Sequence, residues 1–306
     1  MIKHKITFII PTKGREFEIE RLLNSINEQS IKPYEVIIVN AGEDRLKDVL
    51  SEFNNLNIVY LRSTIASLTV QKNMGIERAS AKSSLIGFLD DDLVLEVDAV
   101  EKMLSFWEMA EDKVGGAGFH IINTLPNKCI FAKSFVGIEI KDRGVVLPSG
   151  FNTQFCPVKN TFSVQWLCGG ATVWRKKVLD KYKFDEKFKS YGYYEDVEFS
   201  YRVGKEYSLF MVSDARVRHL HTKSKVELQK YYFLERIISK GRVYFVKKNN
   251  DLSLFSCFLA TIMQTMIYFM KGVLLFNSES FARGMGNLVG FLESVGDRKV
   301  IGGQNE

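Results

Sequence analysis

The chain has 306 residues, of which 46% are hydrophobic and 25% are charged, so its composition is that of a folded globular protein and excludes a disordered chain. Its formal net charge is +6, and residues 201–250 hold 12 Lys or Arg against 4 Asp or Glu. This basic segment suits an anionic membrane surface or a phosphorylated ligand, or else a solvated helix face, and no accompanying motif indicates a nucleic-acid partner.

Apolar runs alternate with helical segments along the first 110 residues. Four short β-rich runs, each ending at a polar cluster or turn, predict strands at 6–11, 34–42, 57–63 and 84–92. The segments between and after them have helical periodicity, at 16–29, 46–53, 70–80 and 98–110. This alternation predicts an α/β fold with right-handed βαβ units, in which helices flank a Rossmann-like, mostly parallel sheet.

The second half of the chain is less regular. Short strands and turns are predicted between about 115 and 165. Residues 166–179 predict a strand with a glycine pair followed by a helix, residues 193–206 a helix with acids near its start, and residues 208–221 a final strand. Because the pattern is helical after about 225, we expect a domain at 1–225 and a C-terminal helical appendage at 226–306.

Polar residues gather at the ends of three predicted strands. Pro11 and Thr12 end the first, Asn40 ends the second, and Asp90–Asp92 follow the fourth. In a parallel sheet these ends share one edge, where ligands bind. Three adjacent aspartates are tolerable where a divalent cation such as Mg²⁺ or Mn²⁺ shares them with a diphosphate. An exposed acidic turn or helix N-terminus is the alternative interpretation.

Four cysteines are present, and none forms a CxxC pair: Cys129, Cys156, Cys168 and Cys257. A reducing compartment is therefore favoured over a disulfide framework or a metal cluster. The N-terminal MIKHKITFII runs directly into a strand and has no signal-peptide cleavage region. We expect a cytoplasmic protein, with a peripheral position at the inner face of the cell membrane as a further expectation.

Seven motifs occur in the order typical of glycosyltransferase family 2, which the chain resembles over roughly residues 5–225: ITFIIPTKGR, EVIIVNAGE, QKNMG, FLDDDL, WLCGGATVWRKKVL, YYEDVEFSYRV and VRHLHTKS. The resemblance implies a GT-A fold and an inverting transferase that uses a nucleotide-diphosphate sugar. The spacing from the glycine pair through FDEKF to YEDVEFSYR looks most like the rhamnosyltransferase-like branch, which implies a hexosyl- or deoxyhexosyltransferase.

On the donor side, the resemblance implies that Pro11 and Thr12 lie near the nucleotide. Asn40 falls where the family usually has an Asp that contacts the base, and since an amide offers two donors as well as an acceptor, the base stays open. Lys72 and Asn73 match an Arg-Asn pair that approaches the donor. A lysine there would counter the diphosphate charge without a bidentate fork.

The aspartates match the DXD-type motif of the family, and this resemblance implies a metal site. Asp92 is the expected direct ligand, and Asp90 or Asp91 is expected to contact the ribose or metal-bound water, with a supporting position behind the ligands as the alternative for Asp90. His219 and His221 alternate at a strand end, so both can face one side and either complete the metal shell or contact the diphosphate. The alternative is that they are packed or surface histidines.

The expected general base is Asp196, with Glu195 as a base or as a residue that orients the acceptor. Both acids could instead only stabilise a helix N-terminus. Trp166, Gly169 and Gly170 match the acceptor side of the family's site, where an indole offers a face for a sugar and glycine permits close backbone approach. The same three residues are equally consistent with packing.

Residues 252–270 have no charge and are almost long enough to span a bilayer. Weakly polar residues such as Ser256, Thr261 and Thr265 follow one helical side, and apolar residues such as Phe255 and Met266 follow the other. This pattern is typical of an interfacial membrane helix, or of one that packs on the catalytic domain or on a second copy in a homo-oligomer. A spanning helix is the third interpretation.

The function expected from these features is metal-dependent, inverting glycosyl transfer to a saccharide or lipid-linked acceptor in cell-surface polysaccharide or glycan synthesis, with Mg²⁺ or Mn²⁺ as cofactor. Two rivals are a sugar-phosphate nucleotidyltransferase and a non-catalytic subunit that binds a sugar or nucleotide. The first should carry a Gly-rich, basic triphosphate loop, which PTKGREFEIE resembles poorly. Retained acids at Asp92 and Asp196 argue against the second.

Overall fold

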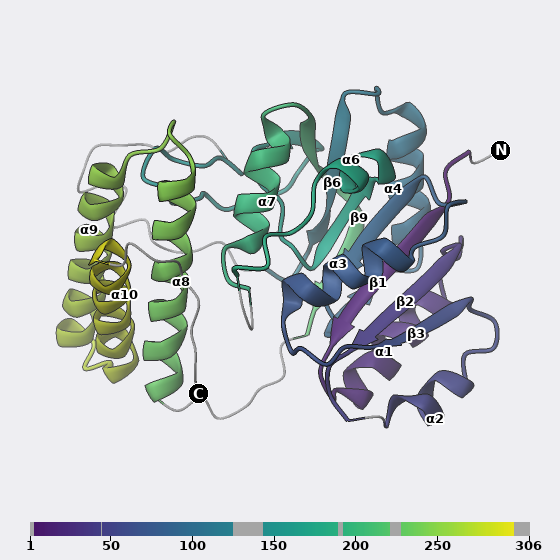
Figure 1. Ribbon diagram of the computed structural model, residues 1–306, viewed down its shortest axis with the longest axis horizontal. Coiled ribbons are helices and arrows are strands. Elements are labelled where there is room, and N and C mark those ends of the chain that lie inside the picture. Colours follow the sequence, from purple (N-terminus) through teal and green to yellow (C-terminus); the bar gives the residue numbers. More distant parts are fainter. Residues whose placement is uncertain (1–2, 44, 125–142, 189–191, 221–227, 297–306) are drawn as a thin grey trace.

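The computed structural model describes residues 3–43, 45–124, 143–188, 192–220 and 228–296 (Figure 1). Within these residues one nine-stranded sheet has the order β3-β2-β1-β4-β8-β6-β9-β5, and β7 also pairs with β9. The strands are β1 (Ile6–Thr12), β2 (Glu35–Asn40), β3 (Ile58–Arg62), β4 (Leu85–Leu89), β5 (Leu93–Leu95), β6 (Val114–Ile121), β7 (Phe162–Val164), β8 (Ala171–Arg175) and β9 (Ser208–His219). The helices are α1 (Glu16–Asn27), α2 (Leu46–Ser51), α3 (Leu68–Arg78), α4 (Ala99–Met109), α6 (Lys176–Lys181), α7 (Glu195–Gly204), α8 (Leu228–Lys248), α9 (Leu254–Leu274) and α10 (Ser278–Gly296).

The α/β class with a helix-flanked sheet is confirmed. Strands β3, β2, β1 and β4 are parallel, as the predicted βαβ units require, and β6 is parallel to β9. The remaining pairs, β4–β8, β6–β8, β5–β9 and β7–β9, are antiparallel, so the sheet as a whole is mixed. The expectation of a mostly parallel sheet therefore holds for β1 to β4, while the other half of the sheet combines one parallel pair with antiparallel pairs.

The central strands β1, β2, β4 and β8 are buried on both faces, since successive residues of a strand point to opposite sides and helices cover each side. In β1, Phe8 and Ile10 join the core beneath α1, α2 and α4, whereas Ile9 joins the core beneath α3, α6 and α7. A strand that is covered on both faces is apolar throughout, which is why these strands appear in the sequence as unbroken apolar runs. The result is a three-layer α/β/α arrangement with its strand ends open at one edge.

The three C-terminal helices lie side by side next to this α/β unit (Figure 1). Helix α8 makes the contact with it: Arg242 Nε donates a hydrogen bond to the hydroxyl of Tyr194 at 3.3 Å, and Phe245 packs against the same ring. The boundary expected at residue 225 lies outside the described residues. The C-terminal helices thus pack, through α8, against Tyr194 in the turn that precedes α7.

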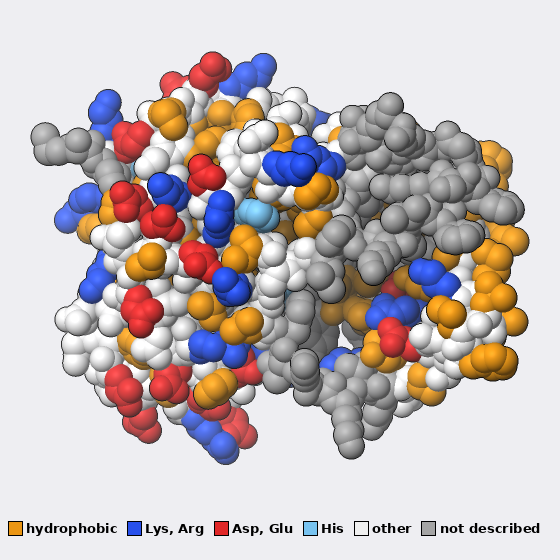
Figure 2. Space-filling model, turned by 180° about the vertical axis from the view of Figure 1, so that it is seen from behind, with side chains coloured by type: hydrophobic (Ala, Val, Ile, Leu, Met, Phe, Trp, Pro, Cys, Tyr) orange, Lys and Arg blue, Asp and Glu red, His pale blue; other side chains and the backbone are white. Residues whose placement is uncertain are grey.

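Helix α9 buries its small and weakly polar residues and exposes its apolar ones. Its buried residues are Cys257, Thr261, Thr265 and Gly272. Phe255 is 71% exposed and Met266 is 58% exposed, and hydrophobic side chains cover the edge of the molecule that α9 and α10 form (Figure 2). Helix α9 therefore has the weakly polar side and the apolar side that the sequence predicts, and its weakly polar side faces the rest of the protein.

Candidate active site

A cavity of about 600 Å³ opens at the carboxyl ends of the parallel strands. Strand β1 contributes Pro11 and Thr12, the segment after β4 contributes the three aspartates, and β9 contributes His219. The other lining residues are Lys13, Arg15, Ala66, Leu68, Gln71 and Tyr193. Two of the three polar strand ends that the sequence predicts to converge therefore line one cavity.

Cations distant in sequence balance the aspartate cluster. Arg15 contacts Asp91 at 2.7 Å and Asp92 at 3.3 Å, and Nε2 of His219 lies 2.7 Å from Oδ1 of Asp92. The hydroxyl of Thr12 donates to Asp91 at 2.6 Å. Burial raises the pKa of Asp91 to about 6 against the effect of Thr12 and Arg15. Burial also opposes ionisation of Asp92, but His219 and Arg15 hold its pKa below the ordinary value.

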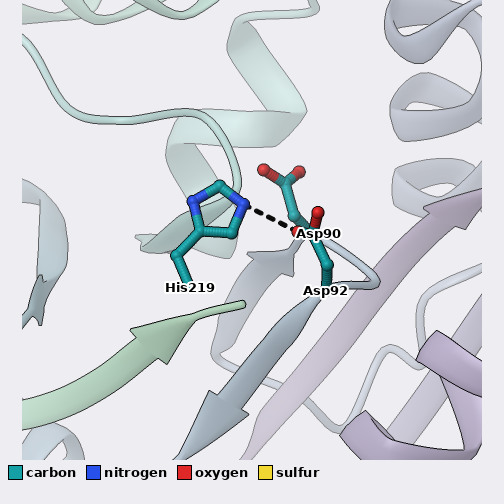
Figure 3. Close-up of side chains that lie close together, drawn as sticks. All are labelled: Asp90, Asp92 and His219. Atoms are coloured by element: carbon teal, nitrogen blue, oxygen red, sulfur yellow. Dashed lines mark ion pairs between the residues drawn. The ribbon is translucent and has the colours of Figure 1, made fainter. Parts of the chain in front are cut away.

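Asp90, Asp92 and His219 form a group that could hold a metal ion (Figure 3). Each offers one ligand atom, and these atoms lie within 4.8 Å of one another. The antiparallel pairing of β5 and β9 sets this geometry, because Leu93 is opposite His219 and the amide of Leu220 donates to the carbonyl of Asp92 at 2.9 Å. Two carboxylates suit Mg²⁺ or Mn²⁺, and an imidazole is more typical of transition metals. His221 lies outside the described residues.

The glycine pair makes room for acidic side chains. The backbone amide of Asp90 donates to the carbonyl of Gly170 at 2.8 Å, and a Cβ atom on Gly170 would overlap the Asp90 carboxylate. A Cβ atom on Gly169 would lie 2.8 Å from Oε1 of Glu195 and 2.9 Å from Nζ of Lys72. Both positions therefore require glycine for close packing, while their contact with an acceptor stays a prediction.

Lys72 links the aspartate cluster to the acidic pair at the start of α7. Its ammonium lies 3.0 Å from Oε1 of Glu195, and both side chains are buried. Burial opposes the charge of Lys72, but Glu195, Asp90 and Asp196 together raise its pKa. Burial raises the pKa of Glu195 to about 7, although Lys72 acts to lower it. The lysine is a buried counter-ion and does not line the cavity.

A constrained turn places the two acids. Tyr194, directly before them, has a left-handed backbone with φ of 80°, which is costly for a residue other than glycine. Its hydroxyl donates to the carbonyl of Gly150 at 2.8 Å, which anchors the turn. Asp196 accepts hydrogen bonds from the amides of Gly169 at 3.1 Å and Val197 at 2.8 Å. Burial raises the pKa of Asp196, as expected for a carboxyl group that could take up a proton.

Asn40 does not line the cavity. It is fully buried, its Oδ1 accepts from the amide of Gly42 at 2.7 Å, and its Nδ2 donates to the hydroxyl of Tyr60 at 3.0 Å. These bonds shape the turn after β2. Contact of Asn40 with the nucleotide base stays a prediction, and it would require the turn after β2 to approach the nucleotide.

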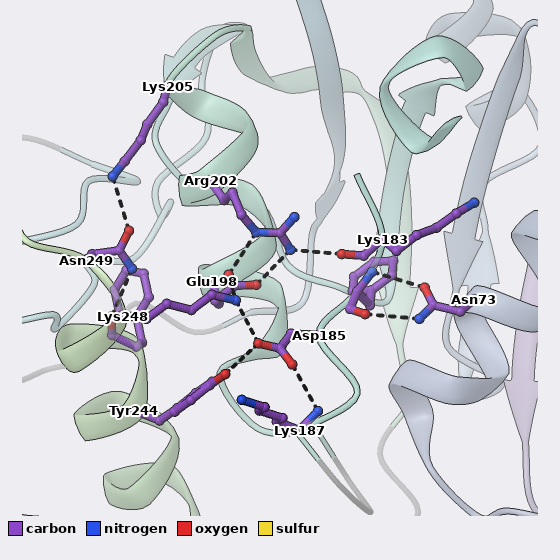
Figure 4. Close-up of polar contacts among 12 residues, drawn as sticks. Asn73, Lys183, Asp185, Lys187, Glu198, Arg202, Lys205, Tyr244, Lys248 and Asn249 are labelled. Carbon is purple, nitrogen blue, oxygen red and sulfur yellow. Dashed lines mark hydrogen bonds and ion pairs between the residues drawn. The ribbon is translucent and has the colours of Figure 1, made fainter. Parts of the chain in front are cut away.

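Asn73 and Trp166 also lie away from the lining of the cavity. The amide of Asn73 donates to the carbonyl of Phe184 and accepts from its backbone N–H, each at 3.0 Å, so it holds the loop after α6 (Figure 4). The indole N–H of Trp166 donates to the carbonyl of Thr153 at 3.0 Å, and its ring packs on Phe155. In the described structure both side chains have packing partners, and their roles toward ligands stay predictions.

The same loop is tied to the C-terminal helices. Asp185 accepts hydrogen bonds from the Tyr244 hydroxyl and the Lys248 ammonium, each at 2.7 Å, and Lys248 also contacts Glu198 of α7 at 2.8 Å (Figure 4). Burial opposes ionisation of Asp185, but these partners lower its pKa. Helix α8 thus fixes the loop and the helix on either side of the acidic turn.

Arg15, Gln71 and Tyr193 also line the cavity, and none of them was expected from the sequence although each lies within one of the seven motifs. Nε2 of Gln71 donates to the carbonyl of Thr12 at 2.8 Å and to that of Val39 at 2.6 Å, which joins the ends of β1 and β2. Both bonds span tens of residues. The sequence feature that could have indicated Arg15 and Gln71 as site residues is their position inside PTKGR and QKNMG.

The mixed sheet and the acids at its strand ends agree with the GT-A fold that the seven motifs imply. The family model described as "Glycosyl transferase family 2" matches residues 7–182, more than half of the chain. The protein therefore belongs to glycosyl transferase family 2.

One protein with a similar sequence and two solved structures with a similar fold are consistent with the family assignment. Glycosyltransferase GlyA of Streptococcus pneumoniae is 30% identical over 106 residues, which make up 34% of this chain and only 15% of that protein. The mannosyltransferase PcManGT from Pyrobaculum calidifontis, solved with GDP-Man and Mn²⁺, has a TM-score of 0.60 at 13% identity and covers 96% of this chain and 88% of its own. TarS 1–349 from S. aureus, solved with UDP-GlcNAc, has a TM-score of 0.53 at 17% identity and covers 95% and 81%. The structural likenesses show the shared fold.

Proposed function

We propose that the enzyme is a metal-dependent, inverting glycosyltransferase that moves a sugar from a nucleotide-diphosphate donor to a saccharide or lipid-linked acceptor in the synthesis of a cell-surface glycan. The observation that carries the proposal is the grouping of Asp90, Asp92 and His219 around one point of the cavity. The PcManGT structure holds GDP-Man and Mn²⁺ and the TarS structure holds UDP-GlcNAc, which supports a nucleotide-sugar donor here.

The donor atoms of this group fit a divalent cation. Two carboxylates suit Mg²⁺ and Mn²⁺ equally, and the imidazole of His219 favours Mn²⁺. When bound, the ion supplies positive charge that stabilises the departing nucleoside diphosphate. Asp92 would have to exchange its ion pair with His219 for the cation, so His219 must lose its proton as the site fills.

The protein itself supplies further positive charge to the cavity. Lys13 and Arg15 line it beside Thr12, and Arg15 is oriented by its bonds to Asp91 and Asp92. A diphosphate in this cavity would face both side chains, which favours an anionic ligand. Lys72 is fully buried and does not line the cavity, so we assign it the role of neutralising the negative charges of Glu195 and Asp90 from inside the protein.

An inverting displacement needs one base on the acceptor hydroxyl. Glu195 is held by Lys72, whereas the described bonds of Asp196 come from the backbone amides of Gly169 and Val197. Asp196 can therefore take up a proton without breaking a buried ion pair. We assign it as the base and Glu195 as the group that holds Lys72 and the turn in place.

The test is a screen of nucleotide-diphosphate sugars for release of the nucleoside diphosphate, with Mn²⁺, with Mg²⁺ and with chelator. We expect one donor to be turned over only when a divalent cation is present. Asp92→Asn should lose this response, and Asp180→Asn, a change at an exposed carboxylate on α6, should keep it. A donor that is turned over equally well in chelator by the unaltered protein would refute the metal dependence.

A further inference from the structure

The interior of the C-terminal helices holds buried polar side chains beside a small apolar cluster of Val243, Val246, Cys257 and Phe291. Glu235 of α8 accepts hydrogen bonds from the Tyr268 hydroxyl of α9 at 3.0 Å and from Arg283 of α10 at 2.8 Å. Asn287 of α10 is fully buried and donates to the Thr265 hydroxyl of α9 at 3.0 Å. Polar side chains from all three helices thus join them in addition to the apolar contacts that are usual in a water-soluble bundle.

Glycines bring α8 and α10 close together. A Cβ atom on Gly286 would overlap the carbonyl oxygen of Tyr232, and one on Gly290 would overlap that of Arg236. The two glycines are four residues apart and face the same helix. Close backbone approach through small residues in a GxxxG spacing, together with hydrogen bonds between helices, is how helices associate when lipid is their surroundings.

The outward surface of α9 and α10 is apolar. Only 22% of the most apolar 18-residue window of α9 is buried, and the mean hydropathy of that window is 1.4. Its exposed residues include Phe255, Leu259, Met266 and Met270, and α10 adds Leu292. Large contiguous apolar surfaces on soluble proteins mark sites that something else covers. We call this surface the α9–α10 face, made up of the exposed large hydrophobic residues Phe255, Phe258, Leu259, Met263, Met266, Met270, Val273, Phe281, Met285, Leu292 and Val295.

We propose that the α9–α10 face rests on the surface of an anionic lipid membrane, with its apolar side chains among the acyl chains. Charge supports lipid as the occupant. Helix α9 has Lys271 as its one charged residue and no carboxylate, and α8, α9 and α10 together carry eight Lys or Arg against three Glu. Such a surface is attracted to anionic headgroups and repels a second copy of itself.

The helices lie along the membrane and do not cross it. Helix α10 packs along both α8 and α9, and its Glu293 forms partly exposed ion pairs with Arg236 and Lys240 of α8, at 2.8 Å and 2.7 Å. A crossing α9 would draw these charges into hydrocarbon, which is costly. An interfacial position leaves them in the headgroup layer or in water.

Flotation with lipid vesicles tests the proposal, and it does not depend on the identity of donor or acceptor. We expect the full chain to float with vesicles that contain phosphatidylglycerol and phosphatidylcholine. Met266→Gln with Met270→Gln should lower the bound fraction about tenfold, because two apolar side chains leave the lipid while the net charge stays the same. Val97→Gln with Met109→Gln removes two exposed apolar residues from the α/β unit and should float like the unaltered protein.

Three results would overturn the proposal. They are no flotation of the unaltered protein, equal loss in both double variants, and a lipid-free dimer that the Met266/Met270 change converts to monomer without any vesicle binding. Light scattering after size-exclusion chromatography detects the last. Matching melting temperatures of the two double variants would show that lost flotation reflects the surface and not unfolding.

Discussion

The carboxylate of Asp90 occupies the space that a side chain on Gly170 would fill. The same two residues share a backbone hydrogen bond of 2.8 Å, where β4 ends beside β8. Since Asp90 is one of the three residues grouped for a cation, the size of residue 170 controls the shape of the proposed metal site although it offers no ligand.

Replacement of Gly170 by Ala should therefore weaken Mn²⁺ binding by about 10- to 100-fold, the usual effect of disturbing groups that position ligands. Isothermal titration calorimetry with Mn²⁺ measures this directly. Gly204→Ala is the matched control, because a Cβ atom there meets nothing closer than 3.8 Å. Unchanged affinity in Gly170→Ala would mean that Asp90 does not take part in the site.

Asp196→Asn should reduce transfer by about 10²- to 10⁴-fold, because the amide cannot accept the proton of the acceptor hydroxyl. Donor affinity should stay close to that of the unaltered enzyme, since Asp196 does not line the donor cavity. Steady-state rates and donor titrations separate the two effects.

Glu195→Gln provides the comparison. If Glu195 only holds Lys72, this variant should lose stability and keep more activity than Asp196→Asn at a temperature where both are folded. The reverse order of activities would transfer the role of base to Glu195.

Affinity for Mn²⁺ should rise with pH. Burial opposes protonation of His219, but Asp92 and Asp90 raise its pKa above the ordinary value. A cation needs the neutral imidazole, so binding is weak while His219 is protonated and strengthens as pH rises through this raised pKa. Titrations between about pH 6 and pH 8.5 cover the range where histidine changes charge.

His219→Asn removes this titrating group, so its binding should be weaker and should depend less on pH. Equal slopes for the variant and the unaltered protein would show that His219 is not the group whose proton is displaced.

Lys72→Met should destabilise the fold by about 3–5 kcal/mol, because it leaves the buried carboxylate of Glu195 without its partner. Urea denaturation followed by circular dichroism measures the change in the free energy of unfolding. Addition of Glu195→Gln should recover part of the loss, and additive effects of the two substitutions would argue against coupling between them.

Asp185 should stabilise the contact between the α/β unit and α8 at neutral pH. Lys248 and Tyr244 lower its pKa, so its contribution is present above the pKa of the unfolded chain and disappears as pH falls through the lower folded value. Asp185→Asn should cost about 1 kcal/mol at pH 7, since the site is partly exposed, and the difference should shrink in acid. Asp180→Asn, on the exposed surface of α6, should show no such trend.

The local pattern of the sequence predicted the elements around the site well. The strands β1, β2 and β4 could be recognised because burial on both faces leaves unbroken apolar runs, and the partly buried β3 was recognised from its β-rich run. Polar residues at the strand ends indicated the edge where a ligand binds. Thr12, the aspartates and His219 do meet at the cavity. These features depend on residues close in sequence or on a rule about parallel sheets.

Contacts between distant segments could not be predicted in this way. The three aspartates have no basic neighbour in sequence, yet Arg15 and His219 neutralise them across the fold. The two-sided pattern of α9 was visible, but which side faces the protein depends on Glu235 and Asn287 of the neighbouring helices. Periodicity shows that a helix has two faces and does not show what each one meets.

The pairing of Leu93 with His219 also has a consequence for the unfolding of the chain. An ion shared by Asp92 and His219 would cross-link two segments that lie far apart in sequence, and it would bind the native arrangement alone. Binding of the ion to Asp92 and His219 would then raise the melting temperature of the protein, and the rise would grow with the concentration of the ion. Heat stability would thereby rank Mn²⁺ against Mg²⁺ before any sugar substrate is known.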